Sequence, residues 1–192
     1  MSAKLAAHTV LDFMLICGRL KTTKRAGWVR KRVHLPESIS DHMYRMGMLS
    51  MVLGSDHGSK INSDKCVKMS IVHDLAEAIV GDITPFDGVS NEDKYNMELA
   101  AMEKITEPLG QCGAQMLELW KEYSEGKTTE AVLVKDIDKL EMVIQAFEYE
   151  RDQQMNLNDF FLSTKGKFVL PSTNAIAERI YEIRGENQNT NK

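Results

Sequence analysis

The stretch that decides the fold runs from residue 71 to residue 85 and reads Ile-Val-His-Asp-Leu-Ala-Glu-Ala-Ile-Val-Gly-Asp-Ile-Thr-Pro. His73 and Asp74 are adjacent polar residues inside an apolar run of the kind found in protein cores. Burying such groups costs free energy unless they are paired or bound to a cation. Two further candidate ligands lie at a distance, His42 upstream and Asp138 downstream. Together the four residues predict a metal site in the core, and a metal there indicates a hydrolase.

The candidate ligands lie on segments with helical spacing. His42 is followed by apolar residues at successive intervals of four, three and four positions, and Asp138 has apolar residues four positions before and after it. His73 and Glu77 are four residues apart, so in a continuous helix they share one face, with Asp74 beside them. We therefore expect a helical framework that directs these side chains toward one place.

The periodicity is helical along nearly the whole chain, and no segment alternates like a strand. Glycine and proline residues mark the breaks, and the basic segment 21–39 reads as a loop. A chain of 192 residues can bury a sizeable core as one domain. We expect an all-α, single-domain bundle over residues 1–184, with its core motifs at about 40–140 and a disordered polar tail at 185–192. The expected helices cover about residues 8–20, 40–54, 63–80, 91–108, 112–124, 128–153 and 172–184.

Charge and cysteine content narrow the class of protein. The formal net charge of −4 argues against binding a nucleic-acid polymer or a membrane surface broadly, because both need a basic surface. No segment approaches the roughly 20 apolar residues of a membrane span, and no secretory signal is evident at the N-terminus. The three cysteines are far apart and form no CxxC pair. We expect a soluble intracellular protein of the cytoplasm.

Two histidines and two aspartates form a mixed nitrogen and oxygen ligand set. Such a set suits borderline or harder divalent ions, among them Mn, Fe, Co, Zn and Mg. Four protein ligands leave open positions only on an ion that accepts five or six, so Mn or Co fits better than tetrahedral Zn. For any single residue, a hydrogen-bonded core histidine or a solvated aspartate is the more common explanation. For four together, with Glu77 and Asp82 alongside, we favour a metal.

Four segments carrying these residues resemble the HD-domain metal-dependent phosphohydrolases. Within them, the closer resemblance is to the 5′-deoxynucleotidases, both the bacterial YfbR type and the eukaryotic HD-domain-containing protein 2 type. The resemblance extends over about residues 8–183. The segments that carry it are residues 27–29, 36–45, 73–85 and 134–142.

This resemblance implies an HD-domain bundle that uses a divalent metal (Mn, Co or Mg) to remove the 5′-phosphate from deoxynucleoside monophosphates. It also implies a homodimer. Glu77 and Asp82 would serve catalysis or a second metal, to which the backbone carbonyl of Ile83 would contribute. The residues that would hold the principal metal are His42, His73, Asp74 and Asp138.

The substrate end of the site is expected in the basic segment 19–34, which contains seven Lys or Arg residues and no acid. Arg25 is the candidate contact for the substrate phosphate, because a guanidinium binds it with two parallel hydrogen bonds. Trp28 is a candidate platform for the base or sugar, and a buried core tryptophan is the alternative. In the bacterial type an Arg-Trp dipeptide lines the pocket, whereas two residues separate Arg25 from Trp28 here. Arg45 is a further candidate, with a salt bridge to an acid such as Glu77 or Asp138 as its alternative.

The chemistry needed for phosphate-ester hydrolysis fits this residue set. A metal can orient the phosphate and lower the pKa of bound water, and a carboxylate can position or deprotonate that water. The first hypothesis is a 5′-deoxynucleotidase. An HD-type phosphodiesterase or a deoxynucleoside triphosphohydrolase is the alternative within the same class. A non-catalytic nucleotide-binding HD protein and a metal-free helical scaffold are the alternatives outside it.

Overall fold

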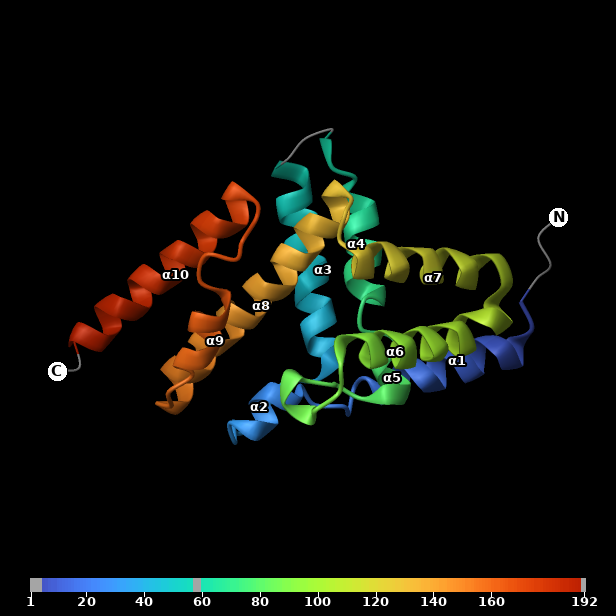
Figure 1. Cartoon of the computed structure of the whole chain (residues 1–192), viewed down its shortest axis with the longest axis horizontal. Helices are drawn as coiled ribbons and strands as arrows, with labels where there is room; N and C mark the ends of the chain where they lie inside the picture. The colour runs from blue at the N-terminus through green and yellow to red at the C-terminus, as the bar shows by residue number, and fades with distance from the viewer. Residues whose placement is uncertain (1–4, 57–59, 191–192) are drawn as a thin grey trace.

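Helices joined by short connections make up the fold in the computed structural model (Figure 1). The structure describes residues 5–56 and 60–190, with side chains up to residue 186. Among them there is no strand, only an isolated bridge between Lys24 and Ser38. None of the described helices is both long and apolar enough to cross a membrane. The α-helices are α1 (Ala7–Arg19), α2 (Ala26–Arg30), α3 (Ile39–Asp56), α4 (Ser63–Val72), α5 (Glu77–Val80), α6 (Asn91–Thr106), α7 (Gly110–Glu125), α8 (Thr129–Gln153), α9 (Asn158–Thr164) and α10 (Pro171–Thr190).

The helices begin where polar side chains satisfy free backbone N–H groups. At the start of α3, Ser38 and Asp41 form a reciprocal pair: Asp41 N–H donates to Ser38 Oγ, and Ser38 N–H donates to the Asp41 carboxylate. Asn62 caps α4 and Thr128 caps α8 by a single bond each, accepting from the backbone N–H three residues later. These caps place the first turns of the three helices that carry the candidate ligands.

The all-α prediction is confirmed, with one correction at its centre. We expected a continuous helix over residues 63–80, but α4 ends at Val72 and α5 begins only at Glu77. Tighter bonds between residues three apart, from Leu75 N–H to Val72 O and from Ala78 N–H to Leu75 O, replace the regular helical ladder there. His73 is therefore the C-cap of α4 rather than an interior helical residue.

Further differences fall in the segments expected to be irregular. The basic loop contains the short helix α2, and α9 lies between the expected helices at 128–153 and 172–184. The last helix extends to Thr190, six residues past the expected end. Gly185 lowers helix propensity by only about 1 kcal/mol, and no proline follows to stop the helix.

Helices α3 and α8 lie in the middle of the molecule, between two groups of helices (Figure 1). On the N-terminal side, α1, α5, α6 and α7 pack around the buried side chains of Ile39 and Met43. On the C-terminal side, α10 packs against the central part of α8, and α2 and α9 pack against its last turns. The metal-ligand candidates lie where α3, α8 and the end of α4 meet, between these groups.

Candidate metal centre

Three segments bring the candidate ligands together. His42 lies in the first turn of α3, His73 and Asp74 follow the last turn of α4, and Asp138 lies near the middle of α8. The Nε2 atom of His42 is 3.2 Å from Asp138 Oδ1 and 3.8 Å from Asp74 Oδ2. The Nε2 atom of His73 is 3.1 Å from Asp74 Oδ2. Ligand atoms of His42, His73 and Asp138 all lie within 4.8 Å of one another.

The donor set fits a cation. Both histidines are buried, yet neither Nε2 atom makes a hydrogen bond, although carboxylate oxygens lie just over 3 Å away. A buried polar atom without a partner costs on the order of 1–3 kcal/mol, so two of them facing one place need an explanation. Nitrogen lone pairs and carboxylates that converge without bonding one another are what a metal ion requires of its ligands.

The electrostatics of the cluster also favour a positive charge at its centre. Burial and the charge of Arg25 lower the pKa of His42, but the neighbouring carboxylates of Asp138 and Glu141 outweigh them and raise it to about 9, so the free ring carries a proton that a bound cation would replace. Burial raises the pKa of Asp74, but His73 and Arg25 outweigh it and bring that pKa down to about 2. Asp138 is likewise held well below its usual pKa against the effect of burial, chiefly by His42. The aspartates therefore stay ionised and available as ligands.

The other nitrogen of each histidine is engaged in a hydrogen bond that orients the ring. His73 Nδ1 bonds the backbone carbonyl of Ser70 at 2.9 Å. His42 Nδ1 bonds the buried carboxylate of Glu141 at 2.5 Å. Tyr123 adds a third support, because its hydroxyl donates to Asp138 Oδ2 at 2.7 Å and its ring lies 4.9 Å from that of His73.

Glu141 and Tyr123 were not among the residues predicted from the sequence. A signal for Glu141 was available, since it lies three positions after Asp138 in an apolar stretch of α8, on the same face. Tyr123 offered no comparable signal, because it lies on a different helix, α7, and only the packing of α7 against α8 brings it to Asp138.

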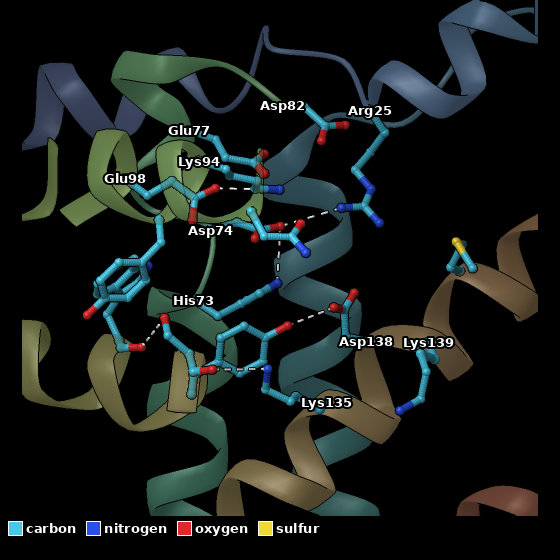
Figure 2. A pocket seen from close by; sticks show the side chains of 16 residues that line it. Arg25, His73, Asp74, Glu77, Asp82, Lys94, Glu98, Lys135, Asp138 and Lys139 are labelled. Atoms are coloured by element: carbon cyan, nitrogen blue, oxygen red, sulfur yellow. Dashed lines mark hydrogen bonds and ion pairs between the residues drawn. The ribbon is translucent and has the colours of Figure 1, made fainter. Parts of the chain in front are cut away.

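A cavity of about 460 Å³ opens beside the cluster (Figure 2). His73, Asp74, Glu77, Asp82 and Asp138 all line it. Figure 2 shows Asp82 and Arg25 on one wall and Lys135 and Lys139 on the opposite side. The lining contains five carboxylates and four basic side chains, so a bound divalent cation would make the balance of charge positive. Such a balance suits an anionic ligand.

Glu77 lies at the start of α5 with 5% of its surface exposed, and its Oε2 atom has no hydrogen-bond partner. Burial, together with the negative charges of Asp74 and Asp82, raises the pKa of Glu77 well above its usual value. A buried carboxyl group with a raised pKa at the wall of a cavity is a recurrent feature of acid–base catalysts.

Asp82 and Ile83 follow the glycine that ends α5, Gly81, whose φ of 78° is accessible mainly to glycine. The carboxylate of Asp82 accepts a hydrogen bond from the backbone N–H of Ala26 at 2.6 Å, which ties this turn to the start of α2. The backbone carbonyl of Ile83 accepts from Lys94 Nζ at 2.8 Å. Asp82 thus lines the cavity, whereas the oxygen of Ile83 is engaged by a lysine ammonium group.

Of the candidate substrate residues, Arg25 lines the cavity with its Nη1 atom 3.5 Å from Asp74 Oδ2. Trp28 is 1% exposed, donates its indole N–H to Glu37 at 2.8 Å, and packs against Phe160 with 4.3 Å between the ring centroids and the rings tilted by 34°. It lines a second, apolar pocket of about 260 Å³, which shares Arg25, Asp82 and Met142 with the main cavity.

Arg45 lies on the far side of His42 and lines neither of these two cavities. Its guanidinium donates to Glu141 and to Glu148, each at 2.7 Å, and also to Gln145. Arg45 thus forms salt bridges, but with these two glutamates of α8 rather than with Glu77 or Asp138.

Comparisons with known proteins show which family this chain belongs to. The family model described as HD domain matches residues 17–179. The 5′-deoxynucleotidase HDDC2 of Dictyostelium discoideum is 48% identical over 185 residues, which cover 91% of this chain and 97% of that protein. The 5′-deoxynucleotidase HDDC2 of Homo sapiens is 42% identical over 183 residues, covering 94% of this chain and 87% of that protein. A solved structure, a conserved hypothetical protein from Pyrococcus furiosus, superposes with a TM-score of 0.74 at 33% identity, covering 90% of this chain and 99% of that one. The His-Asp pair, its two distant partners and these matches together show that the chain belongs to the HD-domain family, alongside relatives named 5′-deoxynucleotidase.

Proposed function

We propose that this protein is a metal-dependent 5′-deoxynucleotidase, a phosphoric monoester hydrolase that converts deoxynucleoside 5′-monophosphates to deoxynucleosides and phosphate. One observation carries the proposal: the unpartnered Nε2 atoms of His42 and His73 face carboxylates at the edge of a cavity that also contains Glu77. The curated relatives support the reaction, since several at 42–48% identity are named 5′-deoxynucleotidase.

His42, His73, Asp74 and Asp138 would hold the ion, with Mn, Co or Mg as the candidates. When bound, the ion supplies charge neutralisation of the phosphate and a lowered pKa for a coordinated water. Ile83, with Glu77 and Asp82, remains the candidate position for a second ion. The ammonium group of Lys94 already donates to the Ile83 carbonyl, and its positive charge opposes a second cation there, which favours one principal metal.

The protein's own side chains would bind the phosphate, transfer the proton and hold the cavity wall in place. Arg25 lies on the cavity wall next to Asp74, where its guanidinium can bind phosphate oxygens and fix the ester relative to the ligands. Glu77 can take a proton from the attacking water or hold one for the leaving oxygen at its unpartnered Oε2 atom, because burial beside Asp74 and Asp82 raises its pKa and so makes it a better proton acceptor than an ordinary glutamate. Asp82 keeps the turn after α5 against Ala26 and so fixes the cavity wall that carries Arg25.

The adjoining apolar pocket is the proposed place for the nucleoside. Trp28 and Phe160 form its inner wall and the exposed Phe86 stands at its edge, so a base or sugar can pack against aromatic surface. Because Arg25 lines both cavities, a phosphate bound there would leave its nucleoside next to this pocket. Trp28 then contributes a buried wall rather than a free stacking platform.

The test is a screen of nucleoside mono-, di- and triphosphates, in ribose and deoxyribose forms, together with a nucleotide phosphodiester, in the presence of Mn²⁺, Co²⁺, Mg²⁺ or a chelator. We expect phosphate release from deoxynucleoside monophosphates that depends on added metal, and little from the other classes. Release of pyrophosphate or triphosphate would favour a triphosphohydrolase, and cleavage of diesters alone a phosphodiesterase. Bound metal and bound nucleotide without any release would favour a non-catalytic binding protein.

We further propose a cytoplasmic homodimer. Cys17, Cys66 and Cys112 are free thiols, as expected in a reducing compartment. The outer face of α3 exposes apolar side chains at helical spacing, and such a patch is a common sign of an interaction surface. These side chains are Tyr44, Met48, Met51 and Val52. Sedimentation equilibrium of the purified protein would test the dimer, and a monomer at micromolar concentration would contradict it.

A further inference from the structure

A chain of hydrogen bonds, buried at Glu141 and His42, reaches the metal-ligand cluster through residues that do not line the cavity. Glu141, on α8, is 0% exposed and lies between two partners on α3. Its Oε2 atom bonds His42 Nδ1 at 2.5 Å, and its Oε1 atom accepts from Arg45 Nε at 2.7 Å. This arrangement leaves neither oxygen of the carboxylate without a partner.

The bond at Nδ1 decides what the other nitrogen of His42 can do. A carboxylate only accepts hydrogen bonds, so Nδ1 must carry the proton, and in the neutral ring Nε2 then carries the lone pair. That lone pair is on the atom that faces Asp138 and Asp74. His73 reaches the same state differently, by donating from Nδ1 to the backbone carbonyl of Ser70. The partner of His73 is a backbone carbonyl, which a substitution cannot remove, whereas the partner of His42 is the side chain of Glu141, which a substitution can remove.

Arg45 fixes the direction in which the Glu141 carboxylate points. Its guanidinium is itself held by Glu148 and Gln145, each on α8, so it cannot turn away with Glu141. The positive charge of Arg45 also offsets the cost of burying the Glu141 carboxylate. The hydrogen bond between Glu141 and His42 therefore depends on Arg45 as well as on Glu141.

We propose that Glu141, oriented by Arg45, is a positioning residue that holds His42 with Nε2 free for the cation and thereby sets the affinity of the site for divalent metal. This inference rests on the proposed metal centre. Outer partners of metal-bound histidines typically contribute about 10- to 100-fold in metal affinity. Neither residue lines either of the two cavities next to the ligands, so their effect on the reaction passes through His42.

The decisive experiment measures Mn²⁺ binding by titration calorimetry on metal-stripped protein. Glu141→Met keeps the volume but removes the acceptor, and we expect its Kd to rise about 10- to 100-fold. Glu141→Gln keeps a carbonyl oxygen that can accept from Nδ1, so its Kd should rise less. At saturating Mn²⁺ the kcat of both variants should return to near the wild-type value, because Glu141 does not touch the substrate.

A matched control is available on the same helix. Glu150 is a second carboxylate of α8 that pairs with an arginine, Arg184; unlike Glu141 it is only half-buried, and it does not contact His42. Glu150→Met should leave the Kd for Mn²⁺ unchanged within about twofold. In Zn²⁺-loaded protein, the Nδ1 proton of His42 should give a strongly shifted proton resonance in the wild type that is absent in Glu141→Met.

Several results would overturn the inference. A wild-type Kd in Glu141→Met would show that His42 needs no such partner. If that variant does not fold, Arg45→Met carries the test. If Arg45→Met has an unchanged Kd for Mn²⁺ but a raised KM for the nucleotide, Arg45 is a substrate contact instead. If the wild-type protein binds no divalent ion, the proposed metal centre itself is wrong. Calorimetry distinguishes this outcome from an unchanged Kd in Glu141→Met, because the wild type then gives no binding signal.

Discussion

At the scale of single residues, Glu77 is the side chain whose surroundings point most directly to proton transfer. It is buried at the cavity wall, and its Oε2 atom has no hydrogen-bond partner. We predict that Glu77→Gln lowers kcat by about 10²- to 10⁴-fold, because the amide cannot exchange the proton. Metal binding, measured by calorimetry, should change little, since four other ligands remain.

The control for that substitution is Glu103→Gln, an exposed change on α6 away from the cavity. It should leave phosphate release at the wild-type rate. Undiminished release by Glu77→Gln with metal still bound would remove Glu77 from the mechanism. A loss of both activity and metal binding would instead make Glu77 a ligand.

Glu37 predicts a dependence of stability on pH. Burial, together with the nearby charge of Glu141, raises its pKa from 4.5 to about 7. The folded state thus keeps a proton that the unfolded state loses, and this group's contribution to stability falls as pH rises from 4.5 to 7. In Glu37→Gln the amide oxygen can still accept the Trp28 N–H, but the side chain no longer titrates. The decrease in the free energy of unfolding between pH 4.5 and 7 should therefore become smaller by up to about 1.4 kcal/mol per pH unit. Urea unfolding of the wild type and of Glu37→Gln, both in the presence of a chelator, at pH 5, 6, 7 and 8 checks this prediction. Equal dependence of the free energy of unfolding on pH in the two proteins would contradict it.

The residues of the site differ in how far the sequence could predict them. His42, His73 and Asp138 lie together as their placement on apolar stripes indicated, because buried polar groups leave a visible exception in a hydrophobic pattern. Lys94 and Tyr123 left no such exception, since each is an ordinary half-exposed residue on its own helix. Their contacts, to Ile83 O and to Asp138, depend on how helices pack at long range.

At the scale of elements, the sequence predicted the long helices well and the short ones poorly. The helix expected at 128–153 matches α8 within one residue, because a clear cap and a long apolar stripe define it. The break between α4 and α5 had no signal, since residues 73–76 contain neither glycine nor proline. Helix α2, with only five residues, gains its stability from tertiary contacts such as the packing of Trp28.

The attachment of α10 to α8 gives a prediction at this scale. The buried carboxylate of Asp136 accepts from the backbone N–H groups of Val169 and Leu170 and from Thr173 Oγ1, at 2.7–3.1 Å. It also pairs with Lys139 at 2.9 Å. Asp136→Ala leaves these donors unsatisfied, so we predict a loss of about 3 kcal/mol or more in the free energy of unfolding.

Urea denaturation measures that loss, and hydrogen exchange should show α10 opening before the rest of the molecule. Asp159→Ala is the comparison, because it breaks only an exposed ion pair with Lys31. That change should cost less than about 1 kcal/mol. Equal effects of the two substitutions would show that Asp136 does not hold α10 in place.

At the scale of the whole molecule, the ligand candidates connect three helices that belong to different parts of the core. Metal binding should therefore stabilise the entire fold. We predict that Mn²⁺ at 100 times its Kd raises the free energy of unfolding by about 2.7 kcal/mol, and that a chelator reverses the gain. Thermal unfolding with and without Mn²⁺ measures it. Asp138→Ala should abolish the shift, and a shift that persists in this variant would place the ion elsewhere.

Helix α8 directs Asp136 toward α10, Asp138 toward the cavity and Glu141 toward α3, all within less than two turns. Inserting or deleting one residue between them would rotate the remainder of the helix by about 100° and shift it by about 1.5 Å. At least one of the three side chains would then face the wrong neighbour. Changes in chain length should thus be tolerated in the connections at either end of α8 and rejected between residues 136 and 141.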